Sequence, residues 1–263
     1  MAFPRHVLDL ADARRLGGPV GEFDARPGFR RAVTWLALLG TVGLPLLFTA
    51  LYHLVQGPRW VGVAAVPLAA GYLGGVGWIV RGGALRGRGS AAYLFRHGLV
   101  RVTREGAAAY RWDRMTAVTV AGVQPAAGRR TRWRFTVTTA DGDRFTLGDE
   151  LPRVRELGDV VVSEITRRVV PAYLAALDEG RALRFGPFVV GGAGVEKDGV
   201  RVPWRAVGEA GLGNGLVYVR PLDGQGFLSA TAGEVPNAVA FAVLCRQARE
   251  GLAAGSARGA SAE

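Results

Sequence analysis

Two apolar stretches near the start of the chain decide its architecture. Residues 33–55 read VTWLALLGTVGLPLLFTALYHLV and residues 60–80 read WVGVAAVPLAAGYLGGVGWIV, and neither contains Asp, Glu, Lys or Arg. At a helical rise of ~1.5 Å per residue, each stretch is long enough for a hydrocarbon core of ~30 Å. Only a short loop separates them, so the chain must turn back. The sequence therefore predicts a transmembrane helical hairpin over 32–80, with both ends on one side of the membrane.

The alternative is a pair of buried helices in a soluble protein. Uncharged runs of this length are uncommon in soluble domains. Aromatic residues also lie at the ends of the runs, as they do at membrane interfaces: Trp35 and Trp78 at one level, Tyr52 and Trp60 at the other. We therefore favour the membrane.

A pair of small residues in the second stretch bears on how the two helices pack. Gly71 and Gly75 have the small-xxx-small spacing that lets helices approach closely in a membrane. Glycine is frequent throughout this chain, however, so the same spacing can also arise by chance.

The flanking charges predict the orientation of the hairpin. Arginines lie just before the first stretch and just after the second, namely Arg26, Arg30, Arg31, Arg81, Arg86 and Arg88. The loop between the stretches carries only Arg59. Because positive residues stay on the cytoplasmic side, we expect both termini in the cytoplasm.

The composition indicates a bacterial chain and a reducing compartment. The chain has 263 residues and a formal net charge of +11, and Lys197 is its only lysine. This preference for Arg, with abundant Ala and Gly, fits a GC-rich bacterial genome. Cys245 is the only cysteine, which excludes an intrachain disulfide and fits a reducing compartment. We therefore expect a multi-pass protein of the bacterial cytoplasmic (inner) membrane.

The segment 1–31 precedes the hairpin and is mixed in character. Its apolar residues Phe3, Val7, Leu8 and Leu10 are spaced for a short amphipathic helix that would lie on the bilayer. A loosely ordered cytoplasmic segment is the alternative.

After the hairpin, the periodicity changes to that of strands. Trp133, Phe135 and Val137 alternate with polar residues, the pattern of a half-buried strand. Glu105-Gly106 and Asp141-Gly142 are turn signals, the second between two strand-like runs. A helix is predicted from Pro152 towards Gly180, because apolar residues then recur every three or four positions.

The order of these patterns then repeats. The first series consists of a strand-like start, a turn, Trp112, further strands, Pro152 and a helix. The second series consists of a similar start, Trp204, further strands, Pro236 and a helix. In the last helix, one face carries Phe241, Leu244, Cys245 and Ala248. The repetition predicts two tandem copies of one unit, at 91–180 and 181–250, before a disordered tail at 251–263.

These pieces resemble bacterial pleckstrin-homology-like (PH-like) domains. The resemblance rests on the Gly-Leu or Gly-Val starts, on Trp112-Asp113-Arg114 and Trp204-Arg205-Ala206, and on Val235-Pro236-Asn237 before the last helix. The whole chain, over roughly residues 16–250, is similar to an uncharacterised family of bacterial membrane proteins with a transmembrane hairpin before PH-like domains. This resemblance implies an α+β membrane protein with two antiparallel barrels, each capped by a C-terminal helix. The basic phosphoinositide motif of eukaryotic PH domains is not recognisable here.

No motif in the sequence predicts catalysis, a cofactor or a metal. His6, His53 and His97 are scattered, and no His-Cys-Asp set has metal-ligand spacing. The acidic residues around Asp141 and Asp149 are explained by turn chemistry and a helix start. The Gly-rich segments 191–194 and 211–215 lack a phosphate-loop context and are predicted to be turns. Trp112 and Trp204 are predicted to be core residues rather than ligand platforms.

The basic residues are the candidates for binding a membrane surface or a partner. They are Arg81, Arg86 and Arg88 after the hairpin, and Arg129, Arg130, Arg132 and Arg134 in the first barrel. Anionic lipid headgroups are nearer partners than nucleic acid for a tethered domain, so we expect no nucleic acid. The three arginines after the hairpin are also explained by their role in orienting the hairpin, without any lipid binding.

The sequence thus favours a non-enzymatic, membrane-anchored module. We expect it to present two PH-like domains to a protein, a peptide or anionic lipid. The alternative is an accessory subunit of a transporter or envelope-assembly complex, with the hairpin as its interface.

Overall fold

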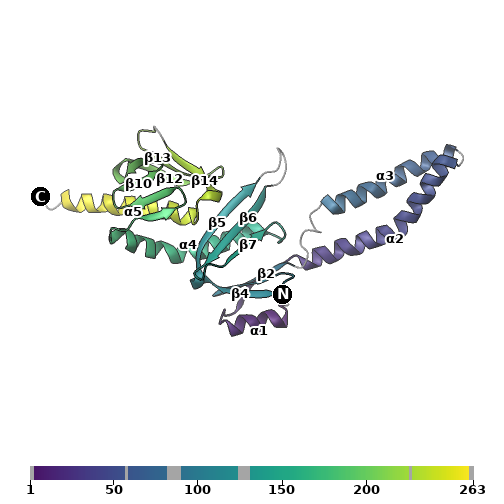
Figure 1. Cartoon of the computed structure of the whole chain (residues 1–263), viewed down its shortest axis with the longest axis horizontal. Helices are drawn as coiled ribbons and strands as arrows, with labels where there is room; N and C mark the ends of the chain where they lie inside the picture. Colours follow the sequence, from purple (N-terminus) through teal and green to yellow (C-terminus); the bar gives the residue numbers. More distant parts are fainter. Residues whose placement is uncertain (1–2, 57–58, 82–89, 124–130, 225–226, 261–263) are drawn as a thin grey trace. The chain divides into compact units, whose positions relative to one another are not determined.

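The fold is given by a computed structural model of the whole chain (Figure 1). The structure describes residues 3–56, 59–81, 90–123, 131–224 and 227–260, with the backbone alone at 54, 59–66, 68, 123 and 252–260. The described part is a mixed α+β structure with five α-helices and four sheets, in which the strand pairings are antiparallel. The chain forms two units: Met1–Ala109 with Asp149–Pro152, and Tyr110–Gly148 with Arg153–Glu263.

A four-stranded sheet forms the centre of the first unit. Its strands are β1 (Pro19–Asp24), β2 (Ala91–Phe95), β3 (Gly98–Val102) and β4 (Ala107–Arg111), in that order across the sheet. Strand β1 pairs with β2 from Pro19 opposite Phe95 to Asp24 opposite Ala91. The predicted turn at Glu105-Gly106 is confirmed between β3 and β4, where Gly106 has φ +148°.

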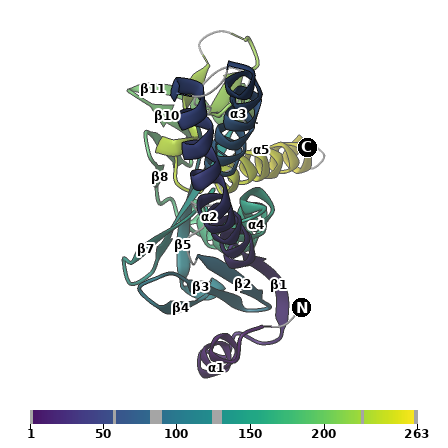
Figure 2. The ribbon, with the colours of Figure 1, turned by 90° about the vertical axis from the view of Figure 1, so that its right-hand side faces the viewer.

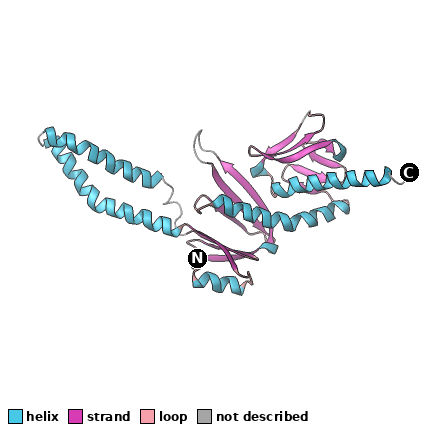
Figure 3. Ribbon diagram, turned by 180° about the vertical axis from the view of Figure 1, so that it is seen from behind, coloured by secondary structure: helices cyan, strands magenta, loops and turns pink. Residues whose placement is uncertain are grey.

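Helix α1 (Arg5–Ala13) packs on one face of this sheet (Figure 3). Its apolar residues Val7 and Ala11 are completely buried against β2 and β3. The amphipathic helix predicted for residues 1–31 therefore forms, but its apolar face is used by the protein and not by a bilayer. The prediction of a helix on the bilayer and the alternative of a loosely ordered segment are therefore both wrong. The reason is that the sheet offers a large apolar surface of Tyr93, Phe95 and Val100.

Two long helices are inserted between β1 and β2. Helix α2 (Arg26–Gln56) and helix α3 (Arg59–Arg81) lie side by side over part of their length (Figure 2). Their close approach is at Gly43, where a Cβ would overlap the ring of Tyr72. A Cβ at Gly71 or Gly75 would meet no described atom within 4 Å, and a packing role for this pair stays a prediction.

Within the described residues, one helix is long and apolar enough to cross a membrane, Arg26–His53. It contains most of the first predicted span and little of it is buried. The second predicted span, 60–80, coincides with α3, for part of which only the backbone is described. The two-helix transmembrane hairpin therefore stays a prediction.

A three-stranded sheet and a long helix begin the second unit. After the short 3-10 helix η1 (Trp112–Arg114) come β5 (Met115–Val123), β6 (Arg132–Thr139) and β7 (Arg144–Gly148). The predicted alternation in β6 is confirmed, because Phe135 and Val137 are buried and Arg134 is exposed. The turn at Asp141-Gly142 is also confirmed, with φ +87° at Gly142.

Helix α4 (Val154–Asp178) packs on this sheet and ends near the predicted Gly180. Phe135 lies against Gly158, where a Cβ would overlap its ring. Pro171 lies inside α4, so the predicted continuation of the helix beyond this proline is confirmed.

The rest of the second unit contains two further antiparallel sheets. The first contains β8 (Leu183–Phe185), β9 (Phe188–Gly191), β10 (Gly194–Lys197) and β11 (Val200–Pro203), in the order β11-β10-β9-β8. After η2 (Trp204–Ala206), the second contains β12 (Val207–Gly213), β13 (Leu216–Pro221) and β14 (Leu228–Thr231). The short helix η3 (Ala232–Glu234) then leads to α5 (Ala238–Ala260).

One apolar core joins these strands to α5. The rings of Phe185 and Phe188 pack against Phe241, and Leu244 and Cys245 are fully buried on the same helix face, as predicted. Trp204 is a core residue, as predicted, and its Nε1–H donates to the Gly191 carbonyl at 3.0 Å. Helix α5 continues to Ala260, inside the tail predicted to be disordered, where alanine, the best helix former, is abundant.

The same order of elements occurs twice along the chain. Each series contains four strands, then a 3-10 helix that begins with a buried Trp, then three strands and a long helix. In the second series Gly186-Pro187 alone connects the first two strands, β8 and β9. In the first series α2 and α3 occupy this position, between β1 and β2.

Candidate functional site

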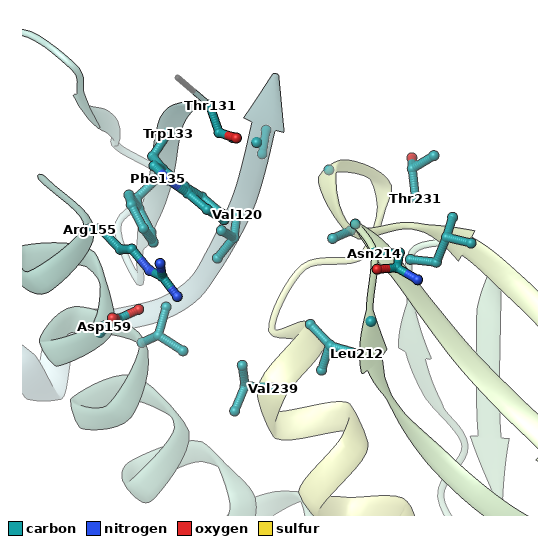
Figure 4. Close-up of a pocket in the computed structure, with 18 residues that line it drawn as sticks. Val120, Thr131, Trp133, Phe135, Arg155, Asp159, Leu212, Asn214, Thr231 and Val239 are labelled. Atoms are coloured by element: carbon teal, nitrogen blue, oxygen red, sulfur yellow. The ribbon is translucent and has the colours of Figure 1, made fainter. Parts of the chain in front are cut away.

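A groove in the second unit lies between strand β5 and the turn that joins β12 to β13 (Figure 4). Its volume is about 1140 Å³. Trp133, Phe135 and Val162 line one side, and Leu212, Leu216 and Val239 line the other. Arg155 and Asp159 of α4 also line it, one positive and one negative. The groove is therefore mostly apolar and has no charge preference of its own.

Strand β5 is at an edge of its sheet, since it pairs only with β6 in the order β5-β6-β7. The main chain of Val118 points away from β6 and is satisfied by Asn237. The Val118 N–H donates to Asn237 Oδ1 at 2.8 Å, and the Asn237 N–H donates to the Val118 carbonyl at 2.8 Å. Asn237, the residue directly before α5, thus takes the place of one residue of a neighbouring strand.

Asn237 is suited to this position by both its backbone and its side chain. Its φ is +55°, in the left-handed region that Asn tolerates better than most residues. Its Nδ2 donates to the Thr116 carbonyl and to the Tyr173 hydroxyl, each at 2.9 Å. The residue is 4% exposed, so these bonds are shielded from water. It attaches the start of α5 to β5 and α4.

Further along β5, the same edge opens into the groove. Outward-facing main-chain groups recur every second residue in an antiparallel strand, so those of Val120 and Gly122 point the same way as those of Val118. Among the described residues, neither forms a backbone hydrogen bond outside its own sheet. Both residues line the groove. Gly233 of η3 lies beside Ala121, between these two residues, with its Cβ position 3.6 Å from the Ala121 Cβ.

An aromatic surface lies directly beside Val120 and Gly122. Gly122 is opposite Trp133 and Val120 is opposite Phe135 in the β5–β6 register. A Cβ on Gly122 would come within 3.2 Å of the Trp133 ring, so a larger residue at this position would press on the ring. The guanidinium of Arg155 lies over the Trp133 ring, 5.5 Å from the ring centroid.

The opposite wall is held by a tight turn. Asn214 and Gly215 both have positive φ, +52° and +77°, as a two-residue β-hairpin turn requires. The Ala232 N–H donates to the Gly215 carbonyl at 2.8 Å, which fixes the turn to the start of η3. Figure 4 shows Leu212, Asn214 and Thr231 on this side of the groove.

The predicted basic residues do not form this groove. Arg132 and Arg134 are exposed on β6, on the face away from Trp133 and Phe135, while Arg129 and Arg130 lie outside the described residues. Arg81 is exposed at the end of α3, and Arg86 and Arg88 lie outside the described residues. The groove residues were not predicted to form a site. The turn predicted for 211–215 is confirmed at Asn214-Gly215, whereas residues 211–213 belong to strand β12.

A second notable site, in the first unit, is the junction of β1 and α2. Asp24 Oδ1 accepts a hydrogen bond from the Arg26 N–H at 2.8 Å, and its Oδ2 accepts one from the Tyr93 hydroxyl at 3.2 Å. Burial and the charge of Asp24 raise the pKa of Tyr93 to about 12. The Ala25 N–H donates to the Ser90 carbonyl, so the strand pairing extends to the base of the helix.

The described residues contain no group of three or more His, Cys, Asp or Glu side chains placed to hold a metal ion. Cys245 is buried in the second core, and this burial raises its pKa to about 12, so the thiol is unreactive at neutral pH. Neither observation points to a catalytic centre.

Comparison with known protein families gives one match. The family of unknown function DUF6585 matches residues 1–254. A search of the curated proteins found no match.

Proposed function

Because the chain belongs to DUF6585, a family of unknown function, we propose its role from its architecture. It is a non-enzymatic interaction module of the bacterial cytoplasmic membrane. Helices α2 and α3 form a transmembrane hairpin, and the two series of strands are PH-like domains that face the cytoplasm and bind a partner protein.

The observation that carries this proposal is the position of the two helices. Helix α2 begins at Arg26, two residues after the end of β1, and Asp24 binds both the first turn of α2 and Tyr93 of β2. The second series has only Gly186-Pro187 at the corresponding place. An anchor rooted inside a sheet fixes that sheet at the membrane surface, whereas a flexible linker would not.

The exposed side chains of the helices support a membrane as their surroundings. Trp35, Phe48 and Tyr52 are 60–69% exposed, and Trp78 is 80% exposed. Large apolar patches of this kind are rare on soluble monomers and mark contact with a partner or with lipid. Length and the absence of acidic or basic side chains inside the spans favour lipid.

The PH-like assignment is supported by the element order. Four strands, three strands and a C-terminal helix occur in each series, with a buried Trp at the junction of the two sheets. This order fits the resemblance drawn from the sequence. A fold of this kind does not by itself specify a ligand, so the ligand must be argued from the site.

The charged residues support a cytoplasmic location for both domains. Arg30, Arg31 and Arg81 are exposed near the ends of the helices that adjoin the sheet. Basic residues next to a membrane helix remain in the cytoplasm and attract anionic headgroups, at about 1 kcal/mol each near the surface. Lipid contact would thus orient the module, with specificity supplied by the partner.

The test is a cysteine-labelling experiment on intact cells. The full chain carries one added cysteine, Arg59→Cys at the first residue of α3 or Glu105→Cys in an exposed turn. We expect a membrane-impermeant maleimide to label the first variant from outside and the second only after lysis. The unmodified chain, with buried Cys245, is the control. Recovery in the soluble fraction, or labelling of Glu105→Cys in intact cells, would contradict the proposal.

A second candidate function is an accessory subunit of a membrane complex, with α2 and α3 as the interface. It is favoured by Gly71 and Gly75, because a Cβ at either position would meet no described atom within 4 Å, which leaves room for another helix. Exchange of the two helices for an unrelated hairpin separates the candidates. Retained function would exclude the subunit role, and lost function with normal membrane insertion would support it.

A further inference from the structure

We propose that a basic cluster in the first unit, at the end of the sheet away from α2, binds an acidic segment of the partner protein. The cluster consists of two adjacent pairs, Arg14-Arg15 after α1 and Arg96-His97 in the turn between β2 and β3. All four residues are exposed. This inference rests on the proposed function and specifies the chemistry of the partner and the place where it binds.

The two pairs are distant in the sequence and are held together by main-chain hydrogen bonds. The His97 N–H donates to the Leu16 carbonyl at 2.8 Å, and the Arg96 N–H donates to the Gly18 carbonyl at 3.1 Å. Leu16 is completely buried in the core that α1 forms with the sheet. Gly17 has φ +77°, and a Cβ there would meet the His97 ring at 3.0 Å. The fold therefore fixes the segment after α1 directly against the basic turn.

No acidic side chain in the described part of the chain neutralises this cluster. None of its four side chains forms an ion pair or a hydrogen bond there, and Asp12, which is also exposed, forms no ion pair either. Exposed arginines elsewhere, such as Arg111 and Arg201, are paired with neighbouring carboxylates. The cluster thus presents positive charge that attracts a negatively charged ligand.

The second series shows that the fold itself does not require these charges. Its corresponding turn, between β9 and β10, is Gly192-Ala193. The segment before β8 contains Arg181, which pairs with Glu179 at 2.6 Å. Both places are therefore neutral overall. The carbonyl groups at the end of α1 favour nearby cations, but they do not account for Arg96-His97 in the turn.

The backbone of Arg15 is a further sign that its side chain has a role. Its φ is +53°, in the left-handed region that Gly and Asn adopt at lower energy than Arg. Residues held in such conformations are frequent at ligand sites. The turn after α1 would form more easily with Asn at this position, so the turn alone does not explain the arginine.

The position of the cluster favours a partner in the cytoplasm over lipid of the same membrane. Strand β1 begins beside the cluster, where Pro19 is opposite Phe95, and ends at Asp24, just before α2. At ~3.4 Å per residue this strand spans roughly 17 Å. That length is about twice the Debye length at physiological salt. Headgroups around α2 are therefore screened from the cluster.

The chemistry of the cluster favours carboxylates over nucleic acid. The aromatic side chains of the neighbouring strand, Tyr93 and Phe95, are buried under α1 and give no platform on which bases could stack. Arginine forms paired hydrogen bonds with carboxylates. A short run of Asp and Glu would supply these groups at the spacing of adjacent side chains.

The experiment uses the full chain in phosphatidylcholine nanodiscs, with a fluorescein-labelled octapeptide of alternating Asp and Glu as the probe. Fluorescence anisotropy measures the affinity. Arg15→Asn removes one charge and keeps a residue that suits φ +53°. Arg96→Gly/His97→Ala reproduces the turn of the second series, and a combined variant carries all three changes. The control, Arg205→Gln/Arg246→Gln, removes two exposed arginines of the second unit.

We expect binding to weaken about twofold to fivefold for each arginine removed from the cluster. The combined variant should lose at least about fourfold, and the control less than about twofold. Arg15→Asn should melt at the same temperature as the wild type or higher, so that its loss of affinity is not a loss of folding. Melting temperatures of the other variants are measured in the same way.

Equal losses for the combined variant and the control would show only the general attraction of a chain with net charge +11, and would overturn the proposal. Tighter binding of a single-stranded octanucleotide or of added phosphatidylglycerol vesicles, with the same dependence on the variants, would also overturn it. The labelling experiment on intact cells is independent of the cluster. A failure there would instead remove the proposed membrane module, so the two failures can be told apart.

Discussion

Asn237 and Val118, 119 positions apart in the sequence, exchange two hydrogen bonds of 2.8 Å as if they were paired residues of one sheet. The same asparagine also binds the Thr116 carbonyl and the Tyr173 hydroxyl. It thereby connects the start of α5 to β5 and to α4.

The Asn237→Ala variant should lower the free energy of unfolding of the second unit by about 2–4 kcal/mol. The change leaves buried partners without hydrogen bonds, which costs about 1–3 kcal/mol for each group, and it strains a residue with positive φ. Urea denaturation followed by tryptophan fluorescence measures the change.

Two matched variants separate the causes for Asn237. Asn237→Gly keeps the side-chain loss but accepts φ +55°, so it should be less damaging than alanine by about 1 kcal/mol. Tyr173→Phe removes only one bond and should cost about 1 kcal/mol. An Asn237→Ala variant as stable as the wild type would show that the hydrogen bonds do not hold α5 in place.

Gly158→Ala should destabilise the second unit by about 1–3 kcal/mol, because its Cβ would overlap the Phe135 ring. Gly251→Ala in α5 is the control, since nothing described lies within 4 Å of that Cβ position. It should stabilise the helix by about 0.5–1 kcal/mol. Thermal unfolding followed by circular dichroism checks both, and a shift in the same direction for both would refute the packing argument.

The stability of the first unit should fall at high pH because of Tyr93. Its pKa is about 12 in the folded chain and about 10 in the unfolded chain. A raised pKa means that folding favours the protonated hydroxyl, so this contribution is complete below pH about 10 and decreases as the pH rises towards 12.

Tyr93→Phe should lose this part of the pH dependence. Denaturant midpoints at pH 9, 10 and 11, together with the phenolate absorbance of the wild type, measure the effect. Identical pH profiles for the two chains would contradict a role for the Tyr93–Asp24 hydrogen bond.

Cys245 should react with a thiol reagent only when the second core opens. Burial raises its pKa to about 12, so both access and the thiolate fraction are low at pH 8. With Ellman's reagent we expect labelling much slower than that of Glu105→Cys, and acceleration by denaturant in step with unfolding. Fast labelling of native Cys245 would mean that α5 leaves the core readily.

Local features of this protein could be predicted from the sequence alone. The alternation at Trp133–Val137, the turn at Asp141-Gly142 and the buried face of α5 were all predictable, because each depends on residues a few positions apart. The length of α2 follows for the same reason, since its apolar run is continuous.

The tertiary structure decided which distant segments meet. Strand β1 pairs with β2 across the inserted helices, and its short sequence with Pro19 and Gly21 carries little strand signal. Asn237 contacts Val118 because the main chain at a sheet edge can bond to any donor and acceptor of the right geometry. No pattern of residues in the sequence therefore predicts this pairing. The groove depends on both sides at once, so periodicity within either side could not reveal it.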